Sequence, residues 1–210
     1  MISRFYVGIL LGIAVLVWGA MLYFNGESLS IAFFKPFSVV SMVLGGAIYS
    51  FNRWIWRWPS LYPWFVSIPN LQGTWKGQII SNWIDPNTGN KIPPVEAFLT
   101  IRQTYFSICL RMITRESYSN MLAGKIYREP RNDTFEIAGI YQNVPRMSTR
   151  ERSPIHHGGI ILHVRGDKRF ILDGSYWTDR ETRGEIRFAE KAEDLFDDYE
   201  RAVTASYQKP

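Results

Sequence analysis

Cysteine and histidine are scarce in this chain, and the motifs in which they hold metals or catalyse reactions are absent. The single cysteine, Cys109, excludes an internal disulfide and suits a reducing compartment. His156 and His157 are adjacent, so they would point to opposite faces of a strand. No HxxxH or CxxC spacing, glycine-rich phosphate loop or nucleophile elbow occurs. The sequence therefore predicts no enzyme, no metal and no bound cofactor.

The chain also lacks the strong excess of positive charge that marks nucleic-acid-binding proteins. Its net charge is +5, but the first 70 residues alone hold four basic residues and one acidic residue. The remainder is therefore close to charge balance, and a nucleic-acid polymer is not an expected partner.

Charged residues are missing from two long stretches near the N-terminus, Phe5 to Gly26 and Pro36 to Asn52. The first stretch has the ~20 apolar residues needed to cross a ~30 Å hydrocarbon core. A cleaved signal peptide is the alternative, but its apolar region is usually only ~7–15 residues long. We therefore expect a two-helix transmembrane hairpin over residues 1–52, with the second span from Ile31 to Phe51.

Basic residues flank this hairpin on one side of the membrane. Arg4 precedes the first stretch, and Arg53 and Arg57 follow the second. The only charged residue in the loop between the two spans is Glu27. Because cytoplasmic flanks carry an excess of Lys and Arg, both termini are expected to be cytoplasmic. Lys35 argues weakly for the opposite orientation.

Alternation of apolar and polar residues dominates residues 71–210, which follow a tryptophan-rich interfacial linker at 53–70. The apolar runs are Leu71–Ile79, Val95–Ile101, Phe106–Met112, Met121–Tyr127, Phe135–Tyr141, Gly158–Val164, Phe170–Thr178 and Gly184–Phe188. Turn clusters separate them. Eight short strands in hairpin order predict a small antiparallel up-and-down β-barrel, whose interior holds side chains or one small ligand. A β-sandwich is the alternative, and the tail at 189–206 has the spacing of a short helix.

The whole arrangement resembles a known family. The barrel segment begins with LQGTWKG and ends in GSYWTDRETRGEI. With the membrane hairpin, these segments resemble the two-transmembrane β-barrel effectors of CBASS, the bacterial cyclic-oligonucleotide anti-phage signalling system. The resemblance implies a barrel that binds a cyclic dinucleotide. It also implies self-association into a homo-oligomer and disruption of the bacterial inner membrane, which aborts infection.

A cyclic dinucleotide requires flat surfaces for its bases and donors for its two phosphates. Alternation places Tyr176, Thr178, Arg180 and Thr182 on one side of a strand end, toward the barrel mouth. Tyr176 would stack on a base, Arg180 would pair with a phosphate, and the threonine hydroxyls would add donors. An ordinary polar hairpin tip is the alternative.

Four further residues complete the predicted ligand-binding set. Tyr141 lies on an inward face beside a loop that carries Arg150 and Arg152, and such a basic loop would close over an anionic ligand. A solvated loop, or one that contacts lipid headgroups, is the alternative. Trp75, near the start of the first strand, is expected to plug the closed end of the barrel, either touching ligand or serving only as core.

Two other functions fit the same fold. A membrane-tethered, lipocalin-like carrier or sensor of a lipid would leave an apolar cavity inside the barrel. A scaffold that only docks another protein would not respond to small molecules.

Overall fold

The computed structural model divides into two compact units, Met1–Val66 and Ser67–Pro210. It describes residues 8, 11–12, 14–16, 19–20, 23–24, 31–85, 88–129, 134–166 and 169–209. Most of the first predicted span lies outside these residues. Within the first unit, α2 runs from Ile31 to Arg53 and is followed by the short 3-10 helices η1 (Ile55–Arg57) and η2 (Pro59–Leu61). In the part of the chain that is described, no helix combines the length and the apolar character needed to cross a membrane.

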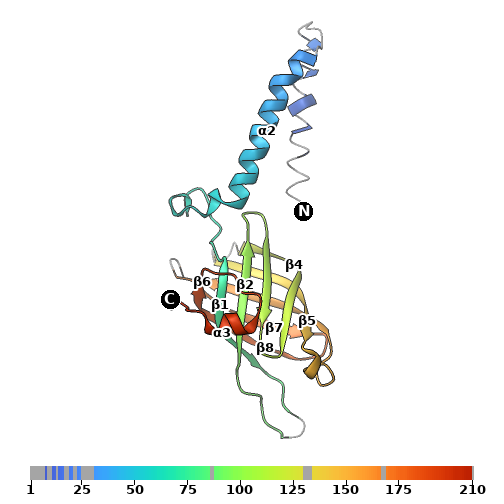
Figure 1. Cartoon of the computed structure of the whole chain (residues 1–210), viewed down its shortest axis with the longest axis vertical. Helices are drawn as coiled ribbons and strands as arrows, with labels where there is room; N and C mark the ends of the chain where they lie inside the picture. Colours follow the sequence, from blue (N-terminus) through green and yellow to red (C-terminus); the bar gives the residue numbers. More distant parts are fainter. Residues whose placement is uncertain are drawn as a thin grey trace. The chain divides into compact units, whose positions relative to one another are not determined.

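The second unit is a closed antiparallel barrel in which each of eight strands pairs with its neighbours in sequence and β8 pairs with β1 (Figure 1). The strands are β1 (Gly73–Ser81), β2 (Val95–Gln103), β3 (Ile108–Ile113), β4 (Ser117–Glu129), β5 (Thr134–Pro145), β6 (His156–Arg165), β7 (Ile171–Thr178) and β8 (Arg183–Ala192). The prediction of an eight-stranded antiparallel barrel is confirmed, and each predicted strand overlaps an observed one.

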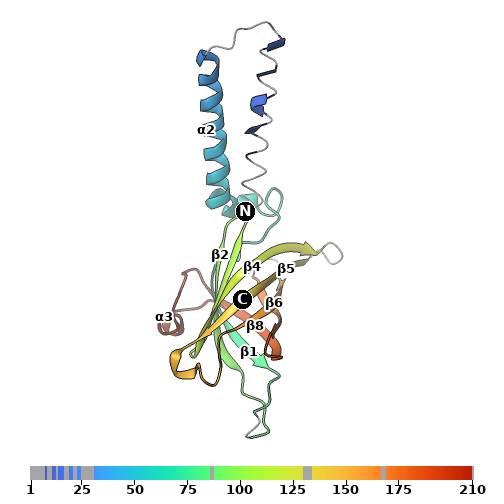
Figure 2. The same cartoon turned by 90° about the vertical axis from the view of Figure 1, so that its right-hand side faces the viewer.

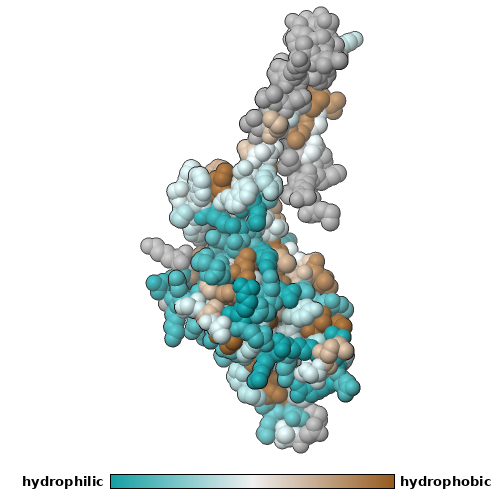
Figure 3. Space-filling view, in the orientation of Figure 1, coloured by the Kyte–Doolittle hydropathy of each residue, from teal (hydrophilic) through white to brown (hydrophobic). Residues whose placement is uncertain are grey.

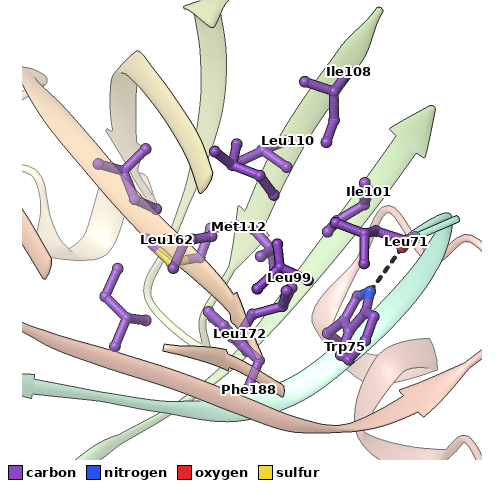
Figure 4. Close-up of a cluster of buried hydrophobic side chains, with 14 of the residues drawn as sticks. Leu71, Trp75, Leu99, Ile101, Ile108, Leu110, Met112, Leu162, Leu172 and Phe188 are labelled. Carbon is purple, nitrogen blue, oxygen red and sulfur yellow. Dashed lines mark hydrogen bonds between the residues drawn. The ribbon is translucent and has the colours of Figure 1, made fainter. Parts of the chain in front are cut away.

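The core of the barrel consists of side chains that alternate inward along every strand. Leu99, Leu162, Leu172 and Phe188, for example, are at most 1% exposed and come from four different strands (Figure 4). Alternation with period two forces this arrangement, because every second side chain of a strand faces the same side. The barrel is therefore held by a filled apolar interior.

One end of the barrel is closed by the segment that leads into β1. Leu71 is fully buried in the core, and its backbone N–H donates to Gln103 Oε1 (2.8 Å). Gln103 Nε2 in turn donates to the carbonyl of Pro69 (3.0 Å). The buried Gln103 thus satisfies both a donor and an acceptor of the incoming backbone, which allows this segment to enter an apolar space. We call this end the plugged end.

The C-terminal segment lies against the outside of the barrel (Figure 1 and Figure 2). Its helix α3 (Tyr199–Thr204) packs Ala202 against Phe98 and Ile113, which point outward from β2 and β3. Phe98 departs from the polar pattern of its strand because this tail covers it. The predicted short helix is present, and it begins at Tyr199 and not near residue 189, because β8 continues to Ala192.

The alternation of the fourth predicted run, Met121–Tyr127, is interrupted directly after Met121 in β4. The register between β4 and β5 shifts between Met121 and Ala123, so a bulge adds one residue there. A bulge moves all following side chains to the other face of the strand. Ala123 is therefore exposed, and Tyr127 lies outside, where its hydroxyl donates to Glu136.

Candidate functional site at the polar mouth of the barrel

The end opposite the plug is lined by polar side chains on the inward faces of the strands. At this end β1, β5 and β7 finish and β4 and β6 begin. On each of these five strands a polar residue lies two positions beyond the last apolar or glycine residue of the inward face: Ser81, Ser119, Asn143, His156 and Thr178. Ser81, Ser119 and Thr178 are at most 9% exposed. We call this layer of five residues the polar mouth.

Tyr141 lies at the inner boundary of the polar mouth. It is 5% exposed, and its ring reaches across to β6, where a Cβ on Gly158 would come within 2.5 Å of its hydroxyl oxygen. Burial, followed by the nearby Tyr176 and Asp179, raises the pKa of the phenol well above its ordinary value. Tyr141 is therefore a neutral hydroxyl, and in the described part of the chain that hydroxyl has no hydrogen-bond partner.

Tyr176 is the second aromatic side chain at this boundary. It belongs to the half-buried residues packed against the core, and its ring lies against Gly184 of β8, where a Cβ would meet a ring carbon at 2.7 Å. Gly158 and Gly184 thus make room for two tyrosine rings. The predicted inward direction of both rings agrees with these contacts.

The turn between β7 and β8 brings together the other three residues predicted from that segment. Thr178 Oγ1 and Thr182 Oγ1 lie 2.6 Å apart, and the backbone N–H of Arg180 donates to Thr178 Oγ1 (3.2 Å). Arg180 Nη1 donates to Ser153 Oγ (2.8 Å), which links this turn to the loop between β5 and β6. Its guanidinium carries no carboxylate partner in the described residues, so its charge is available to an anion.

The β5–β6 loop holds the other two predicted arginines in different ways. Arg150 Nη2 donates to the carbonyl of Pro145 (3.2 Å), and its buried Nε has no hydrogen-bond partner in the described structure. Arg152 is exposed and pairs with Glu116 (2.7 Å). Both flank the polar mouth, but Arg152 is already neutralised by a carboxylate.

Trp75 is separated from the other seven predicted residues. Its indole Nε1 donates to the carbonyl of Leu71 (2.8 Å), and the ring is buried beside the plug (Figure 4). The structure thus places Trp75 in the core at the plugged end, with its one donor satisfied.

Sequence reasoning missed Asn143 and Ser119. Asn143 Nδ2 donates to Ser117 Oγ (3.1 Å) and to Ser119 Oγ (2.9 Å), which joins β5 to β4 inside the mouth. The signal was available, because each residue continues an apolar inward stripe by one more alternation. It was overlooked because a polar residue at the end of such a stripe also marks the end of a strand.

The space available decides where a ligand can lie. A cavity beside Tyr141 inside the barrel measures about 10 Å³, whereas small-molecule sites usually occupy ~300–1,000 Å³. A larger cleft of about 480 Å³ lies outside the barrel and is lined by Arg115, Arg146, Tyr199, Glu200, Val203 and Thr204. In that cleft Arg146 is paired with Glu200 (3.2 Å), and the carboxylate opposes binding of an anion. The polar mouth and its flanking loops therefore remain the better site for a phosphate-containing ligand.

Comparisons with known proteins point to one family. Residues 66–190 match the family described as "Cap15, cyclic dinucleotide receptor domain". A curated relative, the CD-NTase-associated protein 15 of Staphylococcus schleiferi, is 26% identical over 137 residues, which span 65% of this chain and 69% of the relative.

Proposed function

The chain belongs to the Cap15 cyclic dinucleotide receptor family, and on this basis we propose that its barrel binds a cyclic dinucleotide at the polar mouth. The observation that carries this placement is the asymmetry of the barrel. One end is closed by buried backbone, and the other is lined by hydroxyl, amide and guanidinium groups. Such groups provide the donors that phosphates need.

Each part of the ligand has a matching part of the mouth. Arg180 supplies a cation next to the hydroxyls of Thr178 and Thr182, and together they suit a phosphate. Tyr141 adds a neutral phenol that donates without being lost to ionisation. Tyr176 offers a ring on which a base stacks. Because the interior cavity is small, the ligand lies across the mouth and not deep inside the barrel.

The filled interior disfavours the carrier hypothesis. A fatty acid or lipid tail needs an apolar cavity of hundreds of cubic ångströms, but the cavity beside Tyr141 measures about 10 Å³. The side chains around it, such as Leu110 and Ile160, are almost completely buried. A lipid carrier would have to empty this core before loading.

We further propose that the chain is an effector of CBASS without a catalytic step of its own. Ligand binding at the cytoplasmic barrel leads to self-association and then to disruption of the bacterial inner membrane, which aborts infection. The membrane part of this proposal is supported by the two uncharged stretches, Phe5–Gly26 and Pro36–Asn52, and by the basic flanks that favour cytoplasmic termini.

A surface for self-association is supported by apolar residues on the outer face of the barrel. Ile140 pairs with Gly159, which pairs with Trp177, and the indole covers this glycine. Ile140 and Trp177 are about half exposed, as is Leu122 in the bulge of β4. The barrel face seen in Figure 3 is mainly hydrophilic, with hydrophobic residues in small groups. Contiguous apolar residues on a soluble surface are typical of interfaces.

The proposed function is tested with the full chain in detergent micelles and a panel of cyclic dinucleotides. A ligand at ~100 times its dissociation constant stabilises the folded state by ~2.7 kcal/mol, which raises the melting temperature by several degrees. We expect one member of the panel to do so, while the linear dinucleotide with the same bases does not. If no member raises the melting temperature of the folded protein, the receptor proposal is wrong.

The effector steps are tested in liposomes that contain the full chain and a trapped dye. We expect dye release only after the stabilising cyclic dinucleotide is added. Replacing Ile140 with Glu should abolish release while leaving ligand binding intact, because a buried charge opposes the interface. Dye release that persists in the Ile140→Glu variant would show that this outer face is not the surface for self-association.

A further inference from the structure

Asn143 is held in a fixed orientation inside the polar mouth. Its Nδ2 group donates to Ser117 Oγ at 3.1 Å and to Ser119 Oγ at 2.9 Å. A primary amide has two N–H donors, so both are occupied. Ser119 is 4% exposed, which buries one of these two bonds. The side chain of Asn143 is therefore anchored by its nitrogen.

The anchoring leaves a specific set of groups without partners. In the described structure neither Asn143 Oδ1 nor the hydroxyl hydrogen of Ser119 has a partner, since Ser119 Oγ only accepts from Asn143. Tyr141, two residues before Asn143 on the same face of β5, brings a third free polar group. An acceptor and a donor thus lie side by side next to an aromatic ring.

The free carbonyl oxygen of Asn143 can bind some parts of a cyclic dinucleotide but not others, because it can only accept hydrogen bonds. Phosphate oxygens only accept hydrogen bonds, so they cannot bind Oδ1. The donors of such a ligand are the N–H groups of its bases and the ribose hydroxyls. The Watson–Crick edge of every base presents an N–H beside an acceptor, which complements Oδ1 beside the Ser119 hydroxyl.

We propose that Asn143 is a specificity-determining residue that accepts a hydrogen bond from a base N–H, with Ser117 and Ser119 as its positioning residues. This inference rests on the proposed function. It divides the mouth into two halves. The β4–β5 side reads a base, and the β7–β8 turn with Arg180 holds a phosphate.

The test combines a protein change with a ligand change, using the full chain in detergent and the cyclic dinucleotide that stabilises it most. The protein changes are Asn143→Leu and, as a matched control one residue away on the outer face, Gln142→Leu. Ser119→Ala is a milder second variant that loosens the anchor with little change in volume. The ligand changes are methylation of the base N–H on the Watson–Crick edge and, separately, replacement of the ribose 2′-hydroxyl by hydrogen.

We expect base methylation to weaken binding to the unchanged protein about tenfold and to have little effect on Asn143→Leu, because the contact is already lost. Gln142→Leu should keep the full tenfold effect, and Ser119→Ala should show an intermediate one. The inference is overturned if methylation weakens binding equally in all proteins, or if only removal of the 2′-hydroxyl shows this dependence on Asn143. If the unchanged protein binds no cyclic dinucleotide, the proposed function itself fails, which is a different result.

Discussion

The two ends of the barrel are built from the same alternation but use their polar groups differently. At the plugged end, the side-chain amide of Gln103 forms hydrogen bonds with the backbone of residues 69 and 71, and the indole N–H of Trp75 donates to the carbonyl of Leu71. At the polar mouth, the hydroxyl of Tyr141 and the carbonyl of Asn143 have no partners in the described structure. Satisfied polar groups stabilise a fold, whereas uncommitted ones near a surface favour a ligand.

This comparison shows why buried polar residues must be judged by their partners. Gln103 is 2% exposed and Tyr141 is 5% exposed, so burial does not separate them. Their hydrogen bonds separate them. The side-chain amide of Gln103 is bonded to the backbone, whereas the hydroxyl of Tyr141 has no partner in the described structure. Substitutions confined to one end of the barrel should therefore separate the two roles.

The largest effect on stability is expected at the plugged end. Leu71→Ala removes a fully buried side chain, and such changes usually cost ~2–5 kcal/mol of unfolding free energy. Val95→Ala, at the other end, removes a side chain that is 37% exposed and should cost far less. Denaturant unfolding of both variants measures the difference. Equal losses of unfolding free energy in the two variants would contradict the role of Leu71 in closing the plugged end. A loss of ligand affinity in the folded Leu71→Ala protein would contradict the separation of the plugged end from the ligand site.

The largest effect on binding is expected at the mouth. Arg180→Ala should weaken binding of the cyclic dinucleotide about tenfold or more, because a hydrogen bond to a charged group contributes ~1.5–3 kcal/mol. Arg165→Ala is the matched control, since that exposed arginine lies at the plugged end, where it pairs with Asp173 (2.7 Å). Isothermal titration calorimetry of both full-length variants gives the affinities. Unchanged affinity in Arg180→Ala would exclude Arg180 from the site.

A smaller effect is expected at high pH. The pKa of Tyr141 is raised in the folded state from an ordinary value of 10.0, mainly by burial. Below pH 10 the phenol is protonated in both states, so its contribution to stability is fully present. As the pH rises above 10, the unfolded state ionises first and the unfolding free energy falls.

Tyr141→Phe should reduce this alkaline loss. Part of the loss will remain, because burial also raises the pKa of Tyr207 to about 12. The unfolding free energy of the variant and of the unchanged protein, each measured between pH 8 and pH 11, shows whether the two pH dependences differ. Curves that stay parallel would mean that Tyr141 is not buried at the mouth as described.

Much of the barrel could be predicted because alternation survives in a single sequence. All eight strands were found from apolar residues at every second position. The face of β4 beyond Met121 was not found, since a bulge leaves no mark in the pattern. The apolar Phe98 on the outer face of β2 is explained only by the structure, because the tail that covers it lies about 100 residues later in the sequence.

The candidate site was predicted in part for a similar reason. Tyr141, Tyr176 and Thr178 follow from alternation alone, and the structure brings them to one end. The position of the Arg180 side chain does not follow from alternation, because Arg180 lies in a turn. It is fixed by a hydrogen bond to Ser153, which belongs to the β5–β6 loop. The roles of Asn143 and Trp75 depend on hydrogen-bond partners, which the sequence does not show.

The most direct test of the polar mouth as the ligand site is amide hydrogen exchange of the full chain in detergent, with and without saturating cyclic dinucleotide. We predict added protection at residues 117–119, 141–158 and 176–184 and no change at residues 69–72 and 103–108. Protection confined to residues 69–72 and 103–108 would show that the ligand binds at the plugged end and would contradict this account.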